Sequence, residues 1–196
     1  MATRALGRVS FGAECERLAN DGEVRRFVKI DVSFVSKVPD LDAFKHLLFD
    51  YYTDVGRIAR AAGVPEFMPE DMVASSIKGL DDMLPPYGRL ALAHDGAGRL
   101  VGCGAFRRVR QDAVEMKRMF VRPEARGTGL GRTLFEMRIQ EARKAGYSVI
   151  YADTAKGNRP MLEMYERYGF NYIPRYAENA NPPEFEPHLV FLEYRL

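Results

Sequence analysis

The chain has 196 residues, of which 46% are hydrophobic and 29% are charged, so it can form one globular domain and is not a disordered, collagen-like or coiled-coil protein. No segment approaches the roughly 18 uninterrupted apolar residues that cross a bilayer, and we expect no membrane partner. Cys15 and Cys103 cannot make a disulfide framework, and the N-terminus lacks the apolar core of a secretory signal, so we predict a cytoplasmic protein. Arg4 and Arg8, with no acidic residue among the first 13, leave a transit peptide as the alternative.

The charged residues are unevenly distributed, although the net charge is only +2. Acidic residues outnumber basic ones between Asp40 and Asp82, and the balance is reversed from Arg107 to Lys144. A basic segment suits an anionic ligand and an acidic segment suits a cationic one, whereas the simpler interpretation is two solvated helical faces. The net charge gives no indication of nucleic-acid binding, and we predict no such partner.

Helical periodicity dominates the first half of the chain. Apolar residues recur in steps of three and four over residues 41–62, which predicts a long amphipathic helix that Pro39 precedes and Gly63 ends. Residues 66–83 are less regular and are expected to be helical in part. A turn of two prolines, a tyrosine and a glycine at residues 85–88 ends this half.

Short apolar runs replace the helical pattern after this turn. Residues 90–94 and 100–107 flank Asp95-Gly96-Ala97-Gly98, which predicts a β-hairpin. The further predicted elements are a strand at 113–121, a helix from 130 to Gly146, a strand at 149–152, a helix at 160–168, and strands at 170–173 and 189–195. Strands that alternate with helices predict a layered α+β protein with helices against a sheet.

A glycine-rich turn, Arg126-Gly127-Thr128-Gly129-Leu130-Gly131, lies between a predicted strand and a predicted helix. Such a turn lets backbone amides approach a phosphate closely. It is not a P-loop, which needs glycine at the position of Arg126 and lysine at that of Arg132, and it is not the dinucleotide motif, which needs glycine at Arg132. The turn fits the pattern Arg-x-x-Gly-x-Gly, and a plain strand–helix turn is the alternative.

Four landmarks in order carry a resemblance to a known family. They are the strand and its end at residues 115–123, the turn at 126–131, Asn158, and Tyr165-Glu166-Arg167-Tyr168-Gly169-Phe170. With this spacing the sequence resembles the GNAT superfamily of acetyl-CoA-dependent N-acetyltransferases over residues 40–196. The resemblance implies the GNAT fold, in which helices flank one central mixed sheet with a splayed strand pair. We expect residues 31–196 to form this domain and residues 1–30 to be an N-terminal arm or an extra strand.

The resemblance also implies where acetyl-CoA would bind. The amides of the turn would hold the pyrophosphate, and backbone groups at the end of the preceding strand would pair with the pantetheine arm, one amide also facing the thioester carbonyl. An asparagine after the next strand would contact the same arm. The residues implied are Met119, Phe120, Val121, Arg126, Gly127, Thr128, Gly129, Leu130, Gly131, Arg132 and Asn158.

Two residues are candidates for proton transfer. Strand alternation places Glu115 on the same face as Lys117, where a buried carboxylate is either a general base acting through water or a salt-bridge partner of Lys117 or Arg118. Tyr165 occupies the position at which many GNAT enzymes carry the tyrosine that protonates the departing thiolate, and a core tyrosine is the alternative. Cys103 is far from the motif in sequence, so we expect direct attack by the amine without an acyl-enzyme.

The acceptor is the part of the function that the sequence indicates least. In the GNAT fold the acceptor enters opposite the cofactor, which implies Tyr51, Tyr52, Tyr176 and Asn179 as substrate-binding residues. We predict a small-molecule primary amine as acceptor; the alternatives are a protein lysine or N-terminal amine, and a CoA-binding sensor without catalysis. The three histidines show no ligand spacing, so we predict no metal, and family analogy makes a homodimer possible.

Overall fold

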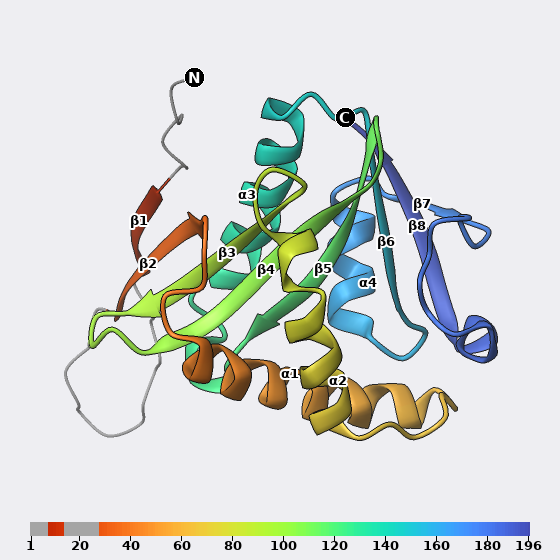
Figure 1. Cartoon of the computed structure of the whole chain (residues 1–196), viewed down its shortest axis with the longest axis horizontal. Helices are drawn as coiled ribbons and strands as arrows, with labels where there is room; N and C mark the ends of the chain where they lie inside the picture. The colour runs from red at the N-terminus through yellow and green to blue at the C-terminus, as the bar shows by residue number, and fades with distance from the viewer. Residues whose placement is uncertain (1–7, 14–27) are drawn as a thin grey trace.

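The protein is organised around one mixed sheet, which we describe from a computed structural model that covers residues 8–13 and 28–196. Within these ranges the sheet has eight strands in the order β1-β2-β3-β4-β5-β6-β8-β7 (Figure 1). The strands are β1 Arg8–Ala13, β2 Val28–Val35, β3 Gly88–Asp95, β4 Leu100–Arg110, β5 Ala113–Val121, β6 Val149–Ala155, β7 Asn171–Ile173 and β8 Leu189–Arg195. All neighbours are antiparallel except β5 and β6, which are parallel.

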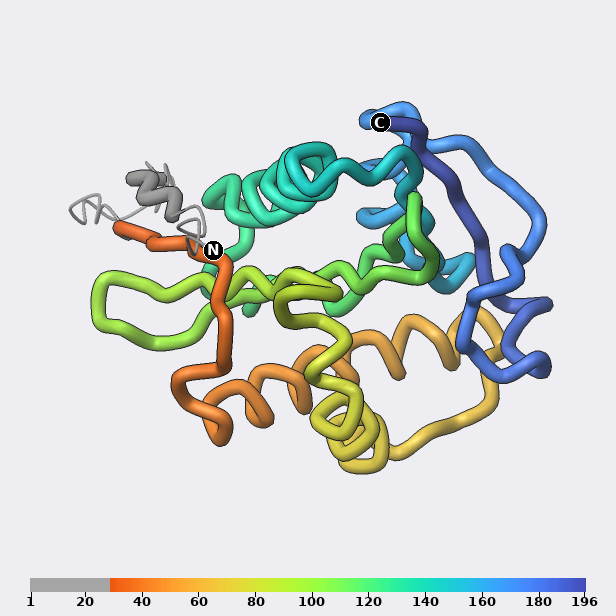
Figure 2. Tube along the Cα trace, turned by 45° about the horizontal axis from the view of Figure 1, so that its top comes forward, coloured from red at the N-terminus to blue at the C-terminus, as the bar shows by residue number. Residues whose placement is uncertain are grey.

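Helices cover both faces of the sheet, as Figure 2 shows. The helices are α1 Leu41–Ala61, α2 Pro69–Lys78, α3 Leu130–Lys144 and α4 Arg159–Arg167, and the 3-10 turns are η1 Leu80–Met83, η2 Pro123–Ala125 and η3 Pro183–His188. α1 begins where the Asp40 side chain accepts a hydrogen bond from the Ala43 amide at 2.9 Å, an N-cap that fixes the predicted start of this helix.

Two apolar layers hold the helices against the sheet. On one face, Phe44 and Leu48 of α1 belong to a buried cluster with Leu92 of β3. On the other face, Leu134 of α3 is buried with Ala91 of the same strand, because successive residues of a strand point to opposite faces. The α1 and α2 layer therefore lies opposite the α3 and α4 layer, with the sheet between them.

The centre of the sheet opens between β5 and β6. β5 is nine residues long and pairs with β4 over its whole length, but it pairs with β6 only from Ala113 to Glu115. Beyond Glu115 the two strands separate. A β-bulge near this point places Arg118 at φ 53°, in the left-handed region that side chains rarely occupy.

The predicted fold class, a mixed sheet with a splayed strand pair flanked by helices, is confirmed. The predicted strand at 149–152 is longer in the structure and ends at Ala155, because β6 pairs with β8 along its entire length. β1 adds a strand to the edge of the sheet, while residues 1–7 and 14–27, Cys15 among them, lie outside the described residues. The division at residue 30 stays a prediction.

Gly88 occupies a position that has no room for a side chain. A Cβ there would lie 2.3 Å from the Asp82 carbonyl oxygen and 2.6 Å from that of Phe106. We expect Gly88→Ala to lower the free energy of unfolding by about 3 kcal/mol, since backbone would have to move. A fall of about 6–12 °C in Tm follows for a chain of this size, measured by thermal unfolding. In the control variant Gly79→Ala, the new Cβ stays 3.7 Å from the nearest atom, and an equal loss in both variants would contradict the steric explanation.

Candidate active site

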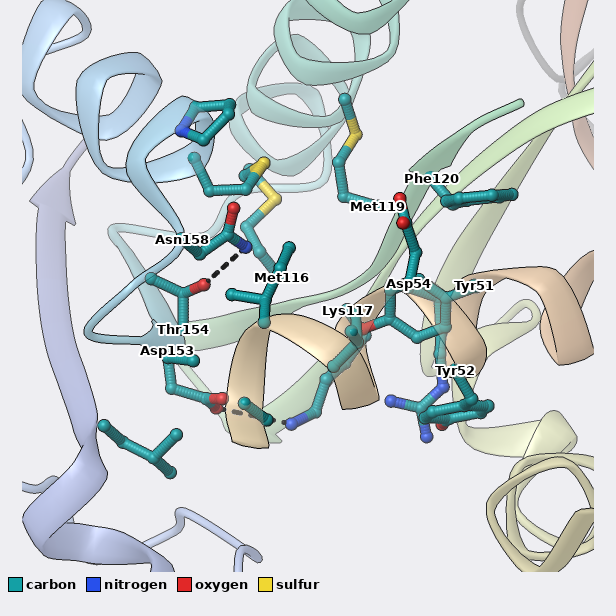
Figure 3. A pocket seen from close by; sticks show the side chains of 18 of the residues that line it. Tyr51, Tyr52, Asp54, Met116, Lys117, Met119, Phe120, Asp153, Thr154 and Asn158 are labelled. Atoms are coloured by element: carbon teal, nitrogen blue, oxygen red, sulfur yellow. Dashed lines mark hydrogen bonds and ion pairs between the residues drawn. The ribbon is translucent and has the colours of Figure 1, made fainter. Parts of the chain in front are cut away.

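A cavity of about 430 Å³ lies where β5 and β6 separate. Its walls come from α1, β5, β6, α4 and the segment around η3, and Figure 3 shows the side chains that point into it. Eight of the predicted site residues line it: Tyr51, Tyr52, Met119, Phe120, Val121, Arg126, Asn158 and Tyr165. Residues predicted for two different purposes, cofactor and acceptor binding, therefore share one cavity.

The glycine-rich turn has the geometry that an anion needs. Gly127 and Gly129 adopt φ values of 80° and 85°, and no atom lies within 4 Å of where their Cβ atoms would be. Gly129 is the N-cap of α3, so the first amides of this helix have no intrahelical acceptor. The Thr128 hydroxyl donates to the Ala125 carbonyl at 2.8 Å and holds the turn in shape. The Leu130 amide also contacts Thr128 Oγ1 at 3.4 Å, and the open space in front of these N-terminal amides fits a pyrophosphate group.

The remaining predicted residues of the turn contribute backbone more than side chains. The Leu130 side chain is buried in the core, and Arg132 makes an ion pair with Glu136 at 2.9 Å on the outer face of α3. Gly131 lies inside the first turn of the helix. Their amides are therefore what an anion would contact.

Arg126 links the turn to the acceptor side of the cavity. Its Nη2 lies 2.6 Å from Oδ2 of Asp54 on α1, and its Nε donates to the Val121 carbonyl at 3.0 Å. These contacts fix the end of β5 and the start of the turn relative to α1.

The inner edge of β5 is available to an extended ligand. Beyond Glu115 no described strand pairs with this edge, which includes Met119, Phe120 and Val121. Across the opening, the Asn158 side-chain amide donates to Thr154 Oγ1 at 2.9 Å (Figure 3). An unpaired strand edge inside a cavity offers main-chain groups that an amide-containing chain can pair with.

Glu115 is completely buried and already bonded on both oxygens. Arg107 donates to Oε2 at 2.6 Å, and Lys117 Nζ lies 2.9 Å from Oε1. The salt bridge to Lys117 that the sequence offered as an alternative is thus present, with Arg107 as a second cation, whereas Arg118 forms no ion pair with Glu115. The carboxylate does not line the cavity, so its predicted role as a base, which stays a prediction, would require a relay.

Asp153 lines the cavity, as Asp54 of α1 does, and the sequence pattern did not predict it as a site residue. It lies on β6 just after the strands separate, with Oδ2 3.5 Å from Lys117 Nζ (Figure 3). Burial alone would raise the pKa of Asp153, but Lys117 and the amide of Asn179 stabilise the charged form, so the net pKa lies below its usual range. Its signal in the sequence is an acidic residue directly after a buried apolar strand.

Tyr176 and Asn179 lie behind the two carboxylates, and the contact with the acceptor that the sequence predicts for them stays a prediction. The Tyr176 hydroxyl is 2.5 Å from Glu115 Oε1, to which it donates, and 3.3 Å from Asp153 Oδ2. Asn179 donates to Asp153 Oδ2 and to the Tyr176 oxygen, both at 2.9 Å. Neither residue lines the cavity, because both are buried against β6 and the start of β5. They connect Glu115 to Asp153.

Tyr165 combines the two interpretations that the sequence left open. Its ring packs against Phe135 and Phe170 in the core, and only 4% of its surface is exposed. It also lines the cavity, and among the described residues its hydroxyl has no hydrogen-bond partner. Burial raises the pKa of Tyr165, so the phenol is protonated at neutral pH.

Comparison with known proteins identifies the fold and chemistry. Residues 43–170 match the Acetyltransferase (GNAT) family. The chain belongs to the GNAT acetyltransferase family. This GNAT protein is 33% identical over 154 residues, 78% of its own length and 90% of the relative's, to an uncharacterized N-acetyltransferase of Schizosaccharomyces pombe. An IAA acetyltransferase of Azospirillum brasilense is 40% identical over 75 residues, which are 38% of this chain and 49% of that protein.

Solved structures share the GNAT fold. An acetyltransferase of Streptococcus agalactiae superposes with a TM-score of 0.66 at 22% identity, over 85% of this chain and 98% of the other. An N-acetyltransferase of Thermoplasma acidophilum, solved in complex with coenzyme A, gives a TM-score of 0.59 at 13% identity, over 84% and 99% of the two chains. As a member of this family, the GNAT protein described here is an acyl-CoA-dependent acetyltransferase.

Two further properties concern metal binding and membrane crossing. In residues 8–13 and 28–196, no three His, Cys, Asp or Glu side chains are grouped so that they could hold a metal ion. No helix in the described part of the chain is both long enough and apolar enough to cross a bilayer.

Proposed function

We propose that this GNAT enzyme transfers an acetyl group from acetyl-CoA to the primary amine of a small molecule, by direct attack of the amine. One observation carries the proposal: a carboxylate, Asp153 of β6, and a protonated phenol, Tyr165 of α4, line the same cavity. An amine has to lose a proton during acetyl transfer and a thiolate has to gain one, so the two groups match the two proton transfers.

The size and cover of the cavity favour a small acceptor over a protein. A volume of about 430 Å³ is within the range of small-molecule sites. Asn181 and Phe185, from the segment between β7 and β8, form part of the wall together with α1. A protein acceptor needs an open groove instead.

The residues that would hold acetyl-CoA follow from the geometry of the turn and of β5. When bound, acetyl-CoA supplies the activated acetyl thioester. The amides from Gly127 to Arg132 would bind its pyrophosphate, and the edge at Met119–Val121, apart from the Val121 carbonyl that Arg126 occupies, would pair with its pantetheine arm.

Asp153 is suited to receive the amine. A primary amine arrives as an ammonium ion because its pKa lies near 10. The lowered pKa of Asp153 keeps the carboxylate charged at neutral pH, so it attracts the ammonium. In this proposal the same carboxylate accepts the proton as the nucleophile forms, although its lowered pKa makes it a weaker base than an ordinary aspartate. Glu115 then has a positioning role in this proposal, because it holds Lys117 and Tyr176 against Asp153.

Direct attack is supported by the state of Cys103. Its thiol is completely buried, and burial raises the pKa of Cys103 to about 12. The Sγ atom donates to the Arg118 carbonyl at 3.0 Å. A protonated and enclosed thiol is not an activated nucleophile.

The experiment that tests this function is release of free coenzyme A thiol from acetyl-CoA with amino acids, polyamines, aminoglycosides and lysine peptides, with coenzyme A binding measured by calorimetry. We expect turnover with one class of small amine. When the enzyme is mixed with acetyl-CoA but no amine, we expect no acetyl group to become attached to the enzyme. Turnover restricted to peptides would overturn the small-molecule assignment. Tight binding without turnover would favour a CoA-binding sensor.

Tyr165→Phe is expected to lower kcat by about 10- to 100-fold and to leave the KM for acetyl-CoA nearly unchanged, because only the proton donor is removed. The matched control is Tyr168→Phe at the C-cap of the same helix, where the hydroxyl donates to Glu136 at 2.5 Å and the residue does not line the cavity. Steady-state kinetics of both variants is the measurement. Full kcat in Tyr165→Phe would leave only the core role for this tyrosine.

A further inference from the structure

Among the described residues, Arg118 is the arginine of the cavity wall whose two terminal nitrogens both lack a hydrogen-bond partner. The cationic side chains that line the cavity are Arg57, Lys117, Arg118, Arg126 and Arg138. Arg57 and Arg126 both pair with Asp54, at 3.4 Å and 2.6 Å. Lys117 lies between the carboxylates described above. Arg138 donates to two backbone carbonyls and to the Met119 sulfur.

Contacts on one side of the Arg118 guanidinium fix its position and leave its two terminal nitrogens, the fork of the guanidinium, without partners in the described part of the chain. Its Nε donates to Ser76 Oγ on α2 at 3.1 Å, and its guanidinium carbon lies 5.5 Å from the centre of the Tyr52 ring on α1. Ser76 is itself bonded to the Tyr52 hydroxyl at 2.6 Å, so the anchor is rigid. Within the described ranges, neither terminal nitrogen of Arg118 has a hydrogen bond or a carboxylate partner.

The backbone at Arg118 is strained in a way that serves this placement. A φ of 53° is unfavourable for arginine, and it occurs where β5 bulges away from β4. The Cys103 thiol, which donates to the Arg118 carbonyl, helps to hold this conformation. The bulge allows Lys117 and Arg118, which are consecutive, both to line the cavity, although residues of a regular strand alternate between faces.

A planar guanidinium with two free terminal nitrogens recognises a carboxylate, to which it can donate two parallel hydrogen bonds. In Figure 3, Tyr52, against which Arg118 packs, and Asp153 lie on opposite sides of Lys117. A ligand with an ammonium group at Asp153 and a carboxylate at Arg118 would therefore span the acceptor side of the cavity. Tyr51, Phe67 and Met72 add apolar walls there.

We propose that the acceptor carries a carboxylate as well as the amine, as an amino acid does, and that Arg118 binds this carboxylate. The inference rests on the proposed function for the fate of the amine. The carboxylate site itself can be tested by binding alone, without any turnover.

The test uses matched products bound to the enzyme in the presence of coenzyme A. N-acetyl derivatives of leucine, methionine, phenylalanine and γ-aminobutyrate are each compared with the corresponding amide by calorimetry. We expect at least one acid to bind about 10- to 100-fold more tightly than its amide, since only the acid has a charged partner for Arg118. Equal or tighter binding of every amide, or no binding of any acid, would overturn the inference.

Variants assign this preference to the guanidinium fork. Arg118→Gln is expected to abolish the preference for acids, and Arg118→Lys to retain only a small part of it, because a lysine keeps the charge without the fork. Arg57→Gln removes a charge from an exposed side chain of the same cavity and is expected to keep the preference. Retention of the full preference in Arg118→Gln would overturn the inference. Thermal unfolding and coenzyme A affinity show whether each variant is folded. If a variant does not fold, the comparison of acids with amides in the unsubstituted protein still tests the inference.

The outcomes separate this inference from the proposed function. If acids bind through Arg118 but no amine is acetylated, the proposed function fails and the carboxylate site stands. If amines without a carboxylate are acetylated as fast as the matching amino acids, the carboxylate site fails and the proposed function stands.

Discussion

Asp153→Asn is expected to lower kcat/KM for the acceptor amine by about 100- to 10,000-fold, because the amide neither attracts the ammonium nor accepts its proton. Coenzyme A affinity is expected to be unchanged, since Asp153 belongs neither to the glycine-rich turn nor to the edge of β5 at Met119–Val121. The measurement is steady-state kinetics with calorimetry of coenzyme A binding. Asp112→Asn serves as the control, because Asp112 lies in the β4–β5 turn and pairs with Arg110 at 2.8 Å. A loss of less than tenfold in Asp153→Asn would assign the proton transfer elsewhere.

The pH profile gives an independent check of the same residue. A lowered pKa means that the Asp153 carboxylate is lost only as pH falls below the range of an ordinary aspartate, so the acidic limb of kcat/KM should lie below about pH 4. Lys117→Met removes the main stabilising charge and is expected to move this limb to higher pH. The amine's own titration affects both proteins equally. An acidic limb that stays in place in Lys117→Met would contradict the role of Lys117.

Gly129→Glu is expected to weaken coenzyme A binding by about 100-fold or more, because it places a negative side chain in the open space before the α3 amides. Gly146→Glu is a matched control at the other end of α3: φ is 84°, and its Cβ would likewise meet no atom within 4 Å. Both variants should lose about 1–2 kcal/mol of stability from the left-handed backbone. Only Gly129→Glu should lose the cofactor, as calorimetry would show. Equal affinities in the two variants would exclude the turn as the phosphate site.

The features that could be predicted from the sequence are the local ones. The start of α1 follows from apolar spacing after Pro39, and the turn before α3 follows from three glycines within six residues. Four of the eight predicted site residues in the cavity, Met119, Phe120, Val121 and Arg126, lie together because the motif fixes both the end of β5 and the start of the turn before α3.

The contacts between distant segments could not be predicted in this way. The predicted strand stops at Ala152 because Asp153 interrupts the apolar run, and only the pairing with β8 extends the strand through this acid. The role of Tyr176 and Asn179 depends on how the loop after β7 folds back onto the carboxylates. The bulge at Arg118 has no glycine or proline to mark it, so strand alternation alone gives the wrong face for one of the two cations there.

The separation of β5 and β6 also bears on whether these strand edges can pair with another chain. Each strand keeps one edge unpaired beyond the last shared residue pair, Glu115 and Tyr151. At the rim of a sheet such edges invite pairing with another chain and lead to aggregation. Here they face each other in the interior, between the α1 layer and the layer of α3 and α4 (Figure 2). A ligand of the right shape can therefore reach these backbone groups, whereas the strands of neighbouring molecules cannot pair with them.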